Sequence, residues 1–229
     1  MTDDDVYITR ISAWAPGVCD SAGWDDWALD KREILSGSKG PDLSFAEPMF
    51  RRRLSQISKM TIQVIHDLMP FSDNVKIFFT SFRGELSRQF QINKMLIEEK
   101  ALSPAAFSLS VFNAPVALAS IALGLKGGYS AIFPANNSFF YSLKTTVAAL
   151  HCGTAQEILF IYADEEVPQE YNGILDVNPK DVNPKAAAFA FLLTKNKNSC
   201  GVKLSLTEEQ NPLEYLKRIL LSGGIHVSS

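Results

Sequence analysis

The chain has 229 residues, 46% of them hydrophobic and 21% charged, a balance that fits one globular domain and excludes wholesale disorder. Its formal net charge of −3 gives no reason to expect nucleic acid as a partner. The cysteines Cys19, Cys152 and Cys200 form no CxxC pair, and the acidic start MTDDDVYITR lacks the apolar core of a secretory signal, so we expect a reducing, cytoplasmic location.

The first part of the chain predicts a strand, a long connection and a helix. Residues 6–14 alternate between apolar and polar side chains, as a half-buried strand does. Residues 20–48 are polar and predict a surface connection, in which Trp24 and Trp27 would anchor the loop to the body. Residues 48–69 carry apolar side chains on about one helical face, and three consecutive arginines begin this predicted helix.

A strand and a second helix follow. Residues 75–79 (VKIFF) are apolar and branched or aromatic, which predicts a buried strand. Residues 82–99 predict the next helix. We expect Arg83 and Glu85, near its beginning, to form a structural ion pair rather than to act in catalysis.

No charged residue occurs between Lys100 and Lys126, so this segment is long enough to cross a bilayer. Pro104 and Pro115 argue against a span, because each removes a backbone donor and breaks the helix in a place where lipid could not replace it. We therefore expect residues 103–125 to form a buried helix, kinked or divided at Pro115, and no membrane span.

The stretch GGYSAIFPANNSFFYSLKTTVAALHCG, residues 127–153, predicts a strand, a tight turn and a helix. That geometry presents a nucleophile in many α/β enzymes, but this turn carries two asparagines, whose amides are not nucleophilic at neutral pH. Ser138 begins the predicted helix, and the segment's only histidine, His151, lies roughly 20 Å further along the axis. His151 therefore cannot serve Ser138 as a base, and the sequence shows no assembled catalytic set.

The last third predicts a strand over residues 157–163 that ends in Asp164, Glu165 and Glu166. Paired carboxylates can bind metal or act as acid and base, but no third ligand stands at a matching spacing, so we expect an acidic loop and no metal site. The remaining predicted elements are a hairpin of strands at 186–194 and 202–206, a short helix at 212–221, and a loose tail at 223–229.

The segment 127–153 resembles the active-site region of the β-ketoacyl synthases, within the thiolase-like superfamily. Ungapped alignment from Gly153 places Asn136 at the position of the family's acyl-accepting cysteine. Further segments are similar to the short ketosynthase-like chain length factors. These segments are YITRISAWAPG, RRRLSQISKM, SFRGEL, SPAAFSLSVFNA and YADEEVP, which extend the resemblance over residues 7–168.

The resemblance implies a thiolase-like fold of αβα layers, truncated to about the N-terminal half of a ketosynthase. We expect a single domain over residues 1–229, with the hairpin and short helix of 186–229 at its end. Ketosynthases take two catalytic histidines from their second half, so the resemblance implies that this chain lacks both histidines as well as the cysteine. It is expected to be no enzyme and to use no cofactor.

As a chain length factor, the chain would pair with a full-length β-ketoacyl synthase, as a heterodimer or heterotetramer, in polyketide, aryl-polyene or related fatty-acid-like biosynthesis. A lone half would otherwise leave an apolar face and a strand edge exposed. The resemblance implies that the interface and acyl-tunnel wall include Phe107, Val111, Phe112, Asn113, Val116, Tyr129, Ala131 and Phe133. The default interpretation of Arg51, Arg52 and Arg53 is a solvated helix face with an internal ion pair or two, and the alternative is a docking point for an acidic acyl carrier protein.

Two other classes of function stay open from the residues alone. One is a self-associating scaffold or acyl-binding protein that has no ketosynthase partner. The other is a small hydrolase that uses Ser138. Co-purification with a ketosynthase separates the first from a chain length factor, and acyl or fluorophosphonate labelling separates the second.

Overall fold

A computed structural model gives the fold of the chain. It describes residues 5–133, 139–153, 155–171, 185–196, 201–208 and 211–228. The turn that carries Asn136, the predicted helix start at Ser138, and Cys200 lie outside the described residues.

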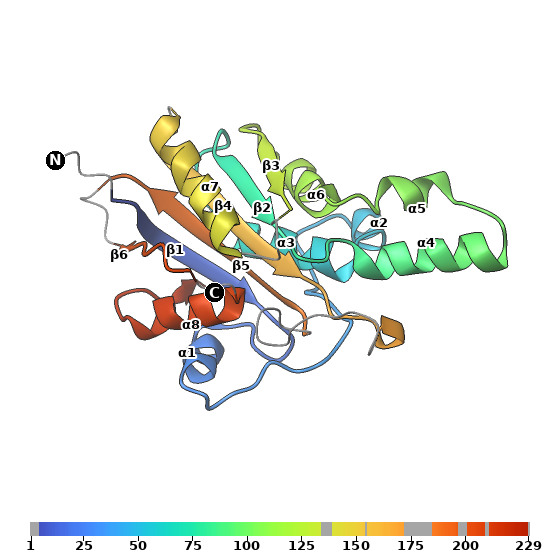
Figure 1. Ribbon diagram of the computed structural model, residues 1–229, viewed down its shortest axis with the longest axis horizontal. Coiled ribbons are helices and arrows are strands. Elements are labelled where there is room, and N and C mark those ends of the chain that lie inside the picture. Colours follow the sequence, from blue (N-terminus) through green and yellow to red (C-terminus); the bar gives the residue numbers. More distant parts are fainter. Residues whose placement is uncertain are drawn as a thin grey trace.

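The strands that the described residues form belong to one sheet (Figure 1). They are β1 (Tyr7–Trp14), β2 (Lys76–Thr80), β3 (Tyr129–Ile132), β4 (Glu157–Asp164), β5 (Ala187–Thr194), β6 (Val202–Lys203) and β7 (Val227–Ser228). Their order is β3-β2-β4-β5-β1-β6, and β7 pairs in parallel with β1. β3, β2 and β4 are parallel, whereas β5 is antiparallel to both β4 and β1.

Strands β4 and β5 lie at the centre of the sheet. Every residue of β5 is buried, and so is every residue of β4 after Glu157. Their sequences, EILFIYAD and AAFAFLLT, are nearly continuous apolar runs, as strands covered on both faces require.

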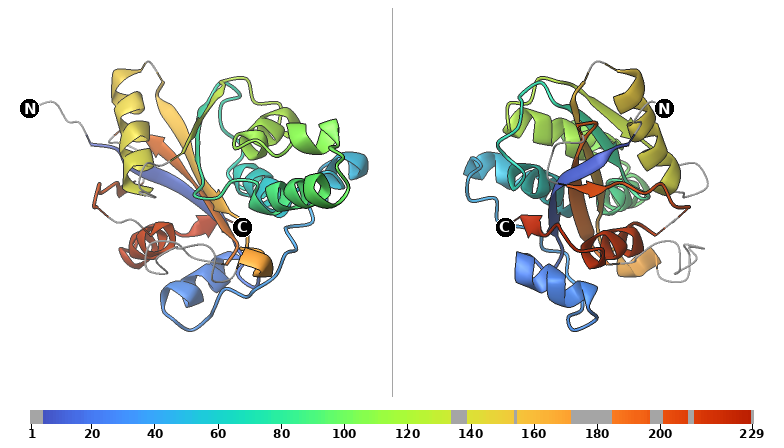
Figure 2. Two further views of the ribbon diagram at one scale, coloured as in Figure 1. Left: turned by 45° about the vertical axis from the view of Figure 1, so that its right-hand side comes forward. Right: turned by 90° about the vertical axis from the view of Figure 1, so that its left-hand side faces the viewer.

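Helices cover both faces of the sheet. They are α1 (Ser21–Ala28), α2 (Pro48–Arg51), α3 (Gln56–His66), α4 (Leu86–Glu98), α5 (Pro104–Ser108), α6 (Ala114–Ala122), α7 (Phe139–Cys152) and α8 (Pro212–Leu221), with a 3₁₀ turn η2 (Gln169–Tyr171). Figure 2 shows α1, α7 and α8 on one side of the sheet and α3 and α6 on the other. Two apolar clusters, one for each face, confirm these αβα layers.

Helix α8 is formed as predicted, and it explains how the face that carries α7 is covered. Asn211 caps its first turn, because its Oδ1 accepts hydrogen bonds from the N–H groups of Leu213 (3.0 Å) and Glu214 (3.3 Å). The Tyr215 ring packs at 5.5 Å from that of Phe139 at the start of α7. The expectation of a bare apolar face is therefore wrong for the surface on which α1, α7 and α8 pack.

Other predictions of local structure are also corrected. Residues 186–206 form no hairpin, because β5 pairs with β4 and β1 whereas β6 pairs with β1. The tail is not loose, since β7 joins the sheet and Ile225 and Val227 are buried. The connection 20–48 contains α1, and the predicted helix 48–69 is divided into α2 and α3.

The charge-free segment 101–125 is divided as expected, but the expectation of a buried helix is wrong for its first part, because no residue of α5 is buried. It forms α5 and α6, with Pro104 and Pro115 each in the first turn of its helix, where a missing N–H costs little. Among the residues described, none of the helices combines the length and the hydropathy that crossing a bilayer demands.

Candidate functional site

Strand β3 lies at one edge of the sheet and carries the candidate interaction surface. Within the described residues it pairs only with β2, and α6 packs beside it. Tyr129 and Ser130 of this strand are exposed. Unpaired strand edges readily accept another chain unless something covers them.

Large apolar side chains remain exposed in and just after β3, on the segment that forms α5 and α6, and on α7. They are Phe107, Val111, Ile121, Tyr129, Phe133 and Tyr141. The first three belong to the charge-free segment between Lys100 and Lys126, so the surface offers no charged side chain over α5 and α6. We therefore take β3 and these apolar side chains as the candidate interaction surface.

The eight residues implied for an interface or tunnel wall fall into different environments. Val116 is 0% exposed and packs in the core between α6 and α3. Asn113 donates a hydrogen bond from Nδ2 to the Tyr129 hydroxyl at 3.0 Å, which ties the start of α6 to the edge strand. Ala131 is partly buried against the same core as Val116, whereas Phe107 and Val111 are exposed.

A row of aromatic rings connects the buried sheet to this edge. The Phe112 ring lies 5.9 Å from that of Phe79 on β2 and 5.4 Å from that of Phe133, which follows β3. Gly84 adopts φ +59°, and a Cβ there would lie 3.1 Å from Cδ2 of Phe112. The row leads outward to the residue just before the turn that holds Asn136.

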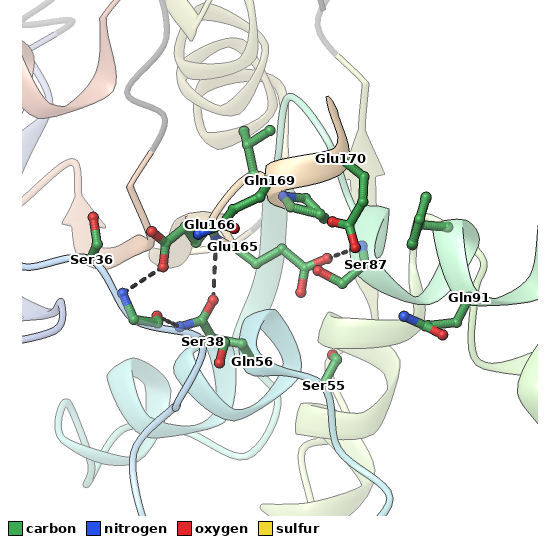
Figure 3. Close-up of a pocket in the computed structure, with 14 residues that line it drawn as sticks. Ser36, Ser38, Ser55, Gln56, Ser87, Gln91, Glu165, Glu166, Gln169 and Glu170 are labelled. Atoms are coloured by element: carbon green, nitrogen blue, oxygen red, sulfur yellow. Dashed lines mark hydrogen bonds between the residues drawn. The ribbon is translucent and has the colours of Figure 1, made fainter. Parts of the chain in front are cut away.

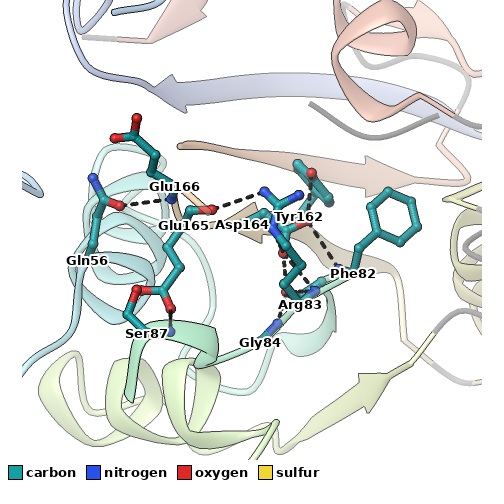
Figure 4. A network of polar contacts seen from close by, with 10 residues as sticks. Gln56, Phe82, Arg83, Gly84, Ser87, Tyr162, Asp164, Glu165 and Glu166 are labelled. Carbon is teal, nitrogen blue, oxygen red and sulfur yellow. Dashed lines mark hydrogen bonds and ion pairs between the residues drawn. The ribbon is translucent and has the colours of Figure 1, made fainter. Parts of the chain in front are cut away.

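A buried carboxylate joins the carboxyl ends of β2 and β4 (Figure 4). Asp164 accepts hydrogen bonds from the Ser81 hydroxyl (2.6 Å) and the Phe82 N–H (3.1 Å). It also accepts from the N–H of Arg83 (3.0 Å) and the hydroxyl of Tyr162 (2.8 Å). Burial and this neighbouring charge raise the pKa of Tyr162 well above its ordinary value, so the phenol stays a donor.

The predicted ion pair between Arg83 and Glu85 is wrong. The Nε of Arg83 lies 4.0 Å from Asp164, and its Nη2 donates to the backbone oxygen of Glu165 at 3.0 Å. Glu85 pairs instead with Arg88, at 3.2 Å. The run of acidic residues after β4, predicted as a surface loop, thus supplies two buried groups.

Both glutamates of this region stabilise helix starts. Glu85 accepts hydrogen bonds at 2.7 Å from the hydroxyls of Ser55 and Ser58, at the beginning of α3. Glu165 accepts from the N–H of Ser87, in the first turn of α4, at 2.6 Å. Carboxylates are favoured there because the helix dipole and the unpaired N–H groups both attract negative charge.

A cavity of about 520 Å³ lies beside Glu165, at the carboxyl end of β4. Its lining side chains are drawn in Figure 3. Its walls come from the loop at 36–38, the starts of α3 and α4, and the segment leading into η2. Glu166 closes one side, since its Oε2 accepts from the N–H of Gly37 and its own N–H donates to Gln56. The described residues contain no cluster of side chains suited to holding a metal ion.

Stability should depend on pH through Glu165, whose pKa burial raises from 4.5 to about 7, with Glu85 and Asp164 adding to the effect. Between these two values the folded chain binds more protons than the unfolded chain, so stability falls as pH rises from about 4.5 to 7. Glu165→Gln keeps an acceptor for the N–H of Ser87 but removes the titrating carboxyl group, and with it this dependence of stability on pH. Denaturation at pH 5 and at pH 8 measures the free energy of unfolding of both proteins. From the lower to the higher pH, that of the wild type should fall by on the order of 3 kcal/mol relative to that of the variant. Parallel stability profiles for both proteins would contradict this assignment.

The three arginines implied for carrier docking do not act alike. Arg51 donates to the carboxylate and carbonyl of Asp42, at 3.1 and 3.0 Å. Arg52 and Arg53 are exposed and, with Arg88, border a hollow of about 690 Å³ between the α2–α3 turn, α4 and α5. A docking partner would therefore meet Arg52 and Arg53 first.

His66 and His226 each lie beside a carboxylate. His66 stacks on Phe45, with ring centroids 3.7 Å apart, and its Nδ1 lies 3.4 Å from Asp67. His226 lies 3.2 Å from Asp25 on α1. Cys19 and Cys152 are free and exposed. Exposed side chains of this kind are not the desolvated, mutually positioned groups of an active site.

Residues 24–218 match the family model "Beta-ketoacyl synthase, N-terminal domain". The chain therefore belongs to the β-ketoacyl synthase N-terminal domain family and has its thiolase-like fold, truncated relative to a complete ketosynthase. No curated protein matches the sequence significantly.

Solved structures agree with this assignment. A ketosynthase (ApeO) in complex with its chain length factor (ApeC) from Xenorhabdus doucetiae matches with a TM-score of 0.72 and 25% identity, over 98% of this chain and 95% of the matched chain. The ishigamide ketosynthase/chain length factor matches with a TM-score of 0.69 and 11% identity, over 86% and 64% of the two chains. AntDE:AntF, a type II polyketide acyl carrier protein in complex with its ketosynthase, matches with a TM-score of 0.59 and 14% identity, over 83% of this chain and 63% of the matched chain. The last two show the fold alone.

Proposed function

We propose that this protein is a non-catalytic chain length factor, which pairs with a full-length β-ketoacyl synthase and shapes its acyl tunnel. The observation that carries the proposal is the similarity to a chain of nearly equal extent in a ketosynthase–chain length factor complex, over 98% of this chain. The product class would be a polyketide or aryl polyene built from fatty-acid-like units, and the complex would be a heterodimer or a heterotetramer.

The edge strand supports pairing with another subunit. β3 offers unpaired backbone groups, and the apolar side chains around it have no cover within the described chain. A partner that adds a strand to β3 and packs on α5 and α6 would satisfy both. Because α1, α7 and α8 already cover the opposite face, the partner would bind at the edge rather than on that layer.

The proposal that the subunit is not an enzyme rests on Asn136. A carboxamide is neither an acyl acceptor nor a precursor of a thiolate, so condensation would take place on the partner. An acyl carrier protein would reach the complex through the partner and the basic hollow at Arg52 and Arg53. Guanidinium groups suit an acidic surface because they donate in bidentate geometry. We place the complex in the cytoplasm.

Co-expression with the ketosynthase of the same host tests the proposal. We expect a one-to-one complex, and substituting a charge into the apolar surface should weaken it at least tenfold. Ile121→Asp is suited to this test, since Ile121 lies at the end of α6 and is 73% exposed. Its matched control is Leu221→Asp, at the end of α8, where the side chain is 53% exposed on another face.

The outcomes distinguish the alternatives. Self-association of the lone chain, with no capture of the ketosynthase, would favour the scaffold or acyl-binding protein. Intact-mass spectra of the purified chain should show no covalent acyl group. An acyl adduct, or fluorophosphonate labelling abolished by Ser138→Ala, would overturn the non-catalytic assignment.

A further inference from the structure

Three buried carboxylates lie just after β2 and β4, and one of them lacks a cation. Asp164 has the guanidinium of Arg83 at 4.0 Å, and Glu85 has that of Arg88 at 3.2 Å. Glu165 is 1% exposed, yet no basic side chain lies within ion-pair distance of it among the described residues. Buried charges in proteins are normally paired, so Glu165 is a position of unbalanced negative charge.

The carboxyl group of Glu165 has few contacts that favour its charge. Its hydrogen-bond donors within the described chain belong to Ser87, whose N–H donates at 2.6 Å. Burial, and then the charges of Glu85 and Asp164, raise its pKa to about 7. Glu165 also lines the cavity of about 520 Å³ (Figure 3). At pH 8 the cavity wall therefore carries a carboxylate without a counter-ion.

The remaining lining of the cavity suits an organic cation. It contains serine hydroxyls, glutamine amides and the carboxyls of Glu165, Glu166 and Glu170, and no lysine, arginine or histidine among the described residues. Phe90, whose ring packs at 5.5 Å from that of Tyr171, adds an aromatic face, and such faces attract cations. The volume is typical of small-molecule sites, roughly 300–1,000 Å³. Open α/β sheets also bind ligands at the carboxyl ends of their strands, where this cavity lies.

The starts of α3 and α4 reach the cavity wall, and helix starts attract negative charge. Carboxylates of the chain already supply it. Glu85 accepts from the hydroxyls of Ser55 and Ser58 at the start of α3. Glu165 accepts from Ser87 in the first turn of α4. A helix start carries about half a positive charge, which offsets only part of one carboxylate, so the cavity disfavours an anion.

We propose that this cavity binds a small organic cation, an ammonium group on a short aliphatic stem, which pairs with Glu165. The stem packs on Phe90 and Pro168, the apolar part of the lining. The ammonium group supplies the positive charge that the neighbouring carboxylates receive from arginine. This inference goes beyond the proposed function and does not depend on it, because the cavity lies at the end of β4 and not at the β3 edge.

Titration of the full chain with n-butylammonium chloride at pH 8, followed by calorimetry, tests the proposal. Two ligands serve as controls, 1-butanol for the stem without the charge and potassium chloride for the ionic strength. We expect the ammonium compound to bind at least tenfold more tightly than 1-butanol, and potassium chloride to give no saturable binding. Equal affinity for 1-butanol, or saturation by potassium, would overturn the proposal, as would the absence of binding by n-butylammonium.

Glu165→Gln tests the ion pair. It keeps an acceptor for Ser87 but removes the charge, and it should weaken n-butylammonium binding at least tenfold. Glu214→Gln is the matched control, since Glu214 is exposed in the first turn of α8 and lies outside the cavity lining. Its affinity should stay within twofold of the wild type. Unchanged binding in Glu165→Gln would place the cation elsewhere.

The pH dependence of binding needs no variant. The ammonium group stays charged between pH 6 and 8, whereas Glu165, with a pKa of about 7, passes from mostly protonated to mostly ionised. Affinity should therefore fall about tenfold from pH 8 to pH 6. The other charged groups around Glu165 are Glu85 and Asp164 with Arg88 and Arg83, and Glu166 and Glu170 after β4.

These other groups remain in Glu165→Gln, so any pH dependence that they cause survives in the variant, and the part due to Glu165 disappears. An equal fall in affinity in both proteins, or none in the wild type, would contradict pairing with Glu165. Failure of the chain to bind a ketosynthase would overturn the proposed function and leave this inference standing.

Discussion

Replacing Asp164 with Ala is expected to lower the free energy of unfolding by about 3–5 kcal/mol. The carboxylate is 1% exposed and accepts hydrogen bonds from four donors, on β4 and on the segment after β2. Its removal takes a carboxylate 4.0 Å away from the buried Arg83 guanidinium and the acceptor from two backbone N–H groups. Unsatisfied buried donors each cost about 1–3 kcal/mol, so the losses come from several groups at once.

Urea denaturation followed by circular dichroism measures this effect, as a lower midpoint at an unchanged slope. Asp42→Ala is the matched control, because Asp42 forms an exposed ion pair with Arg51, and surface pairs contribute about 0–1 kcal/mol. Asp164→Asn retains the shape of the side chain but not its charge. Its loss in the free energy of unfolding should lie between those of Asp164→Ala and Asp42→Ala. A loss as small for Asp164→Ala as for Asp42→Ala would show that the network adds little to stability.

The sequence predicted most of the elements because their signals are local. Apolar side chains at helical spacing defined α8, and alternation defined β1. Strand pairing is not local, and there the prediction was wrong. β5 and β6 are neighbours in the sequence, yet each pairs with β1, whose own sequence gives no sign of these partners.

The same limit explains the acidic residues after β4. A run of charge after a strand usually lies in solvent, and three of the four donors that hold Asp164 come from Ser81, Phe82 and Arg83, about eighty positions away. Only the parallel pairing of β2 with β4 brings these strand ends together. A buried carboxylate of this kind can therefore be found from structure but not from spacing.

The resemblance implied eight residues for an interface or tunnel wall, of which Phe107, Val111, Tyr129 and Phe133 are exposed. It did not distinguish them from Val116, which the packing of α6 on α3 removes from the surface. Burial of one helix face depends on what packs on it, so a list of helical positions cannot separate core from interface.

Phe139→Ala is expected to cost about 3–5 kcal/mol in the free energy of unfolding, comparable with Asp164→Ala. Phe139 begins α7 and is 1% exposed. Its ring lies within 5.5–6.0 Å of the rings of Phe160, Tyr162, Phe189 and Tyr215. Removing it opens a cavity where β4, β5, α7 and α8 meet, and rigid aromatic neighbours cannot collapse to fill it.

Phe140→Ala, the next position on the same helix, is the matched control. Phe140 is half-buried and contacts Tyr141 and Lys144 of its own helix. Phe140→Ala should therefore lower the free energy of unfolding clearly less than Phe139→Ala does. Thermal and urea unfolding of both variants would measure the difference. Equal losses in the two variants would mean that α8 and the sheet hold this end of α7 without the ring.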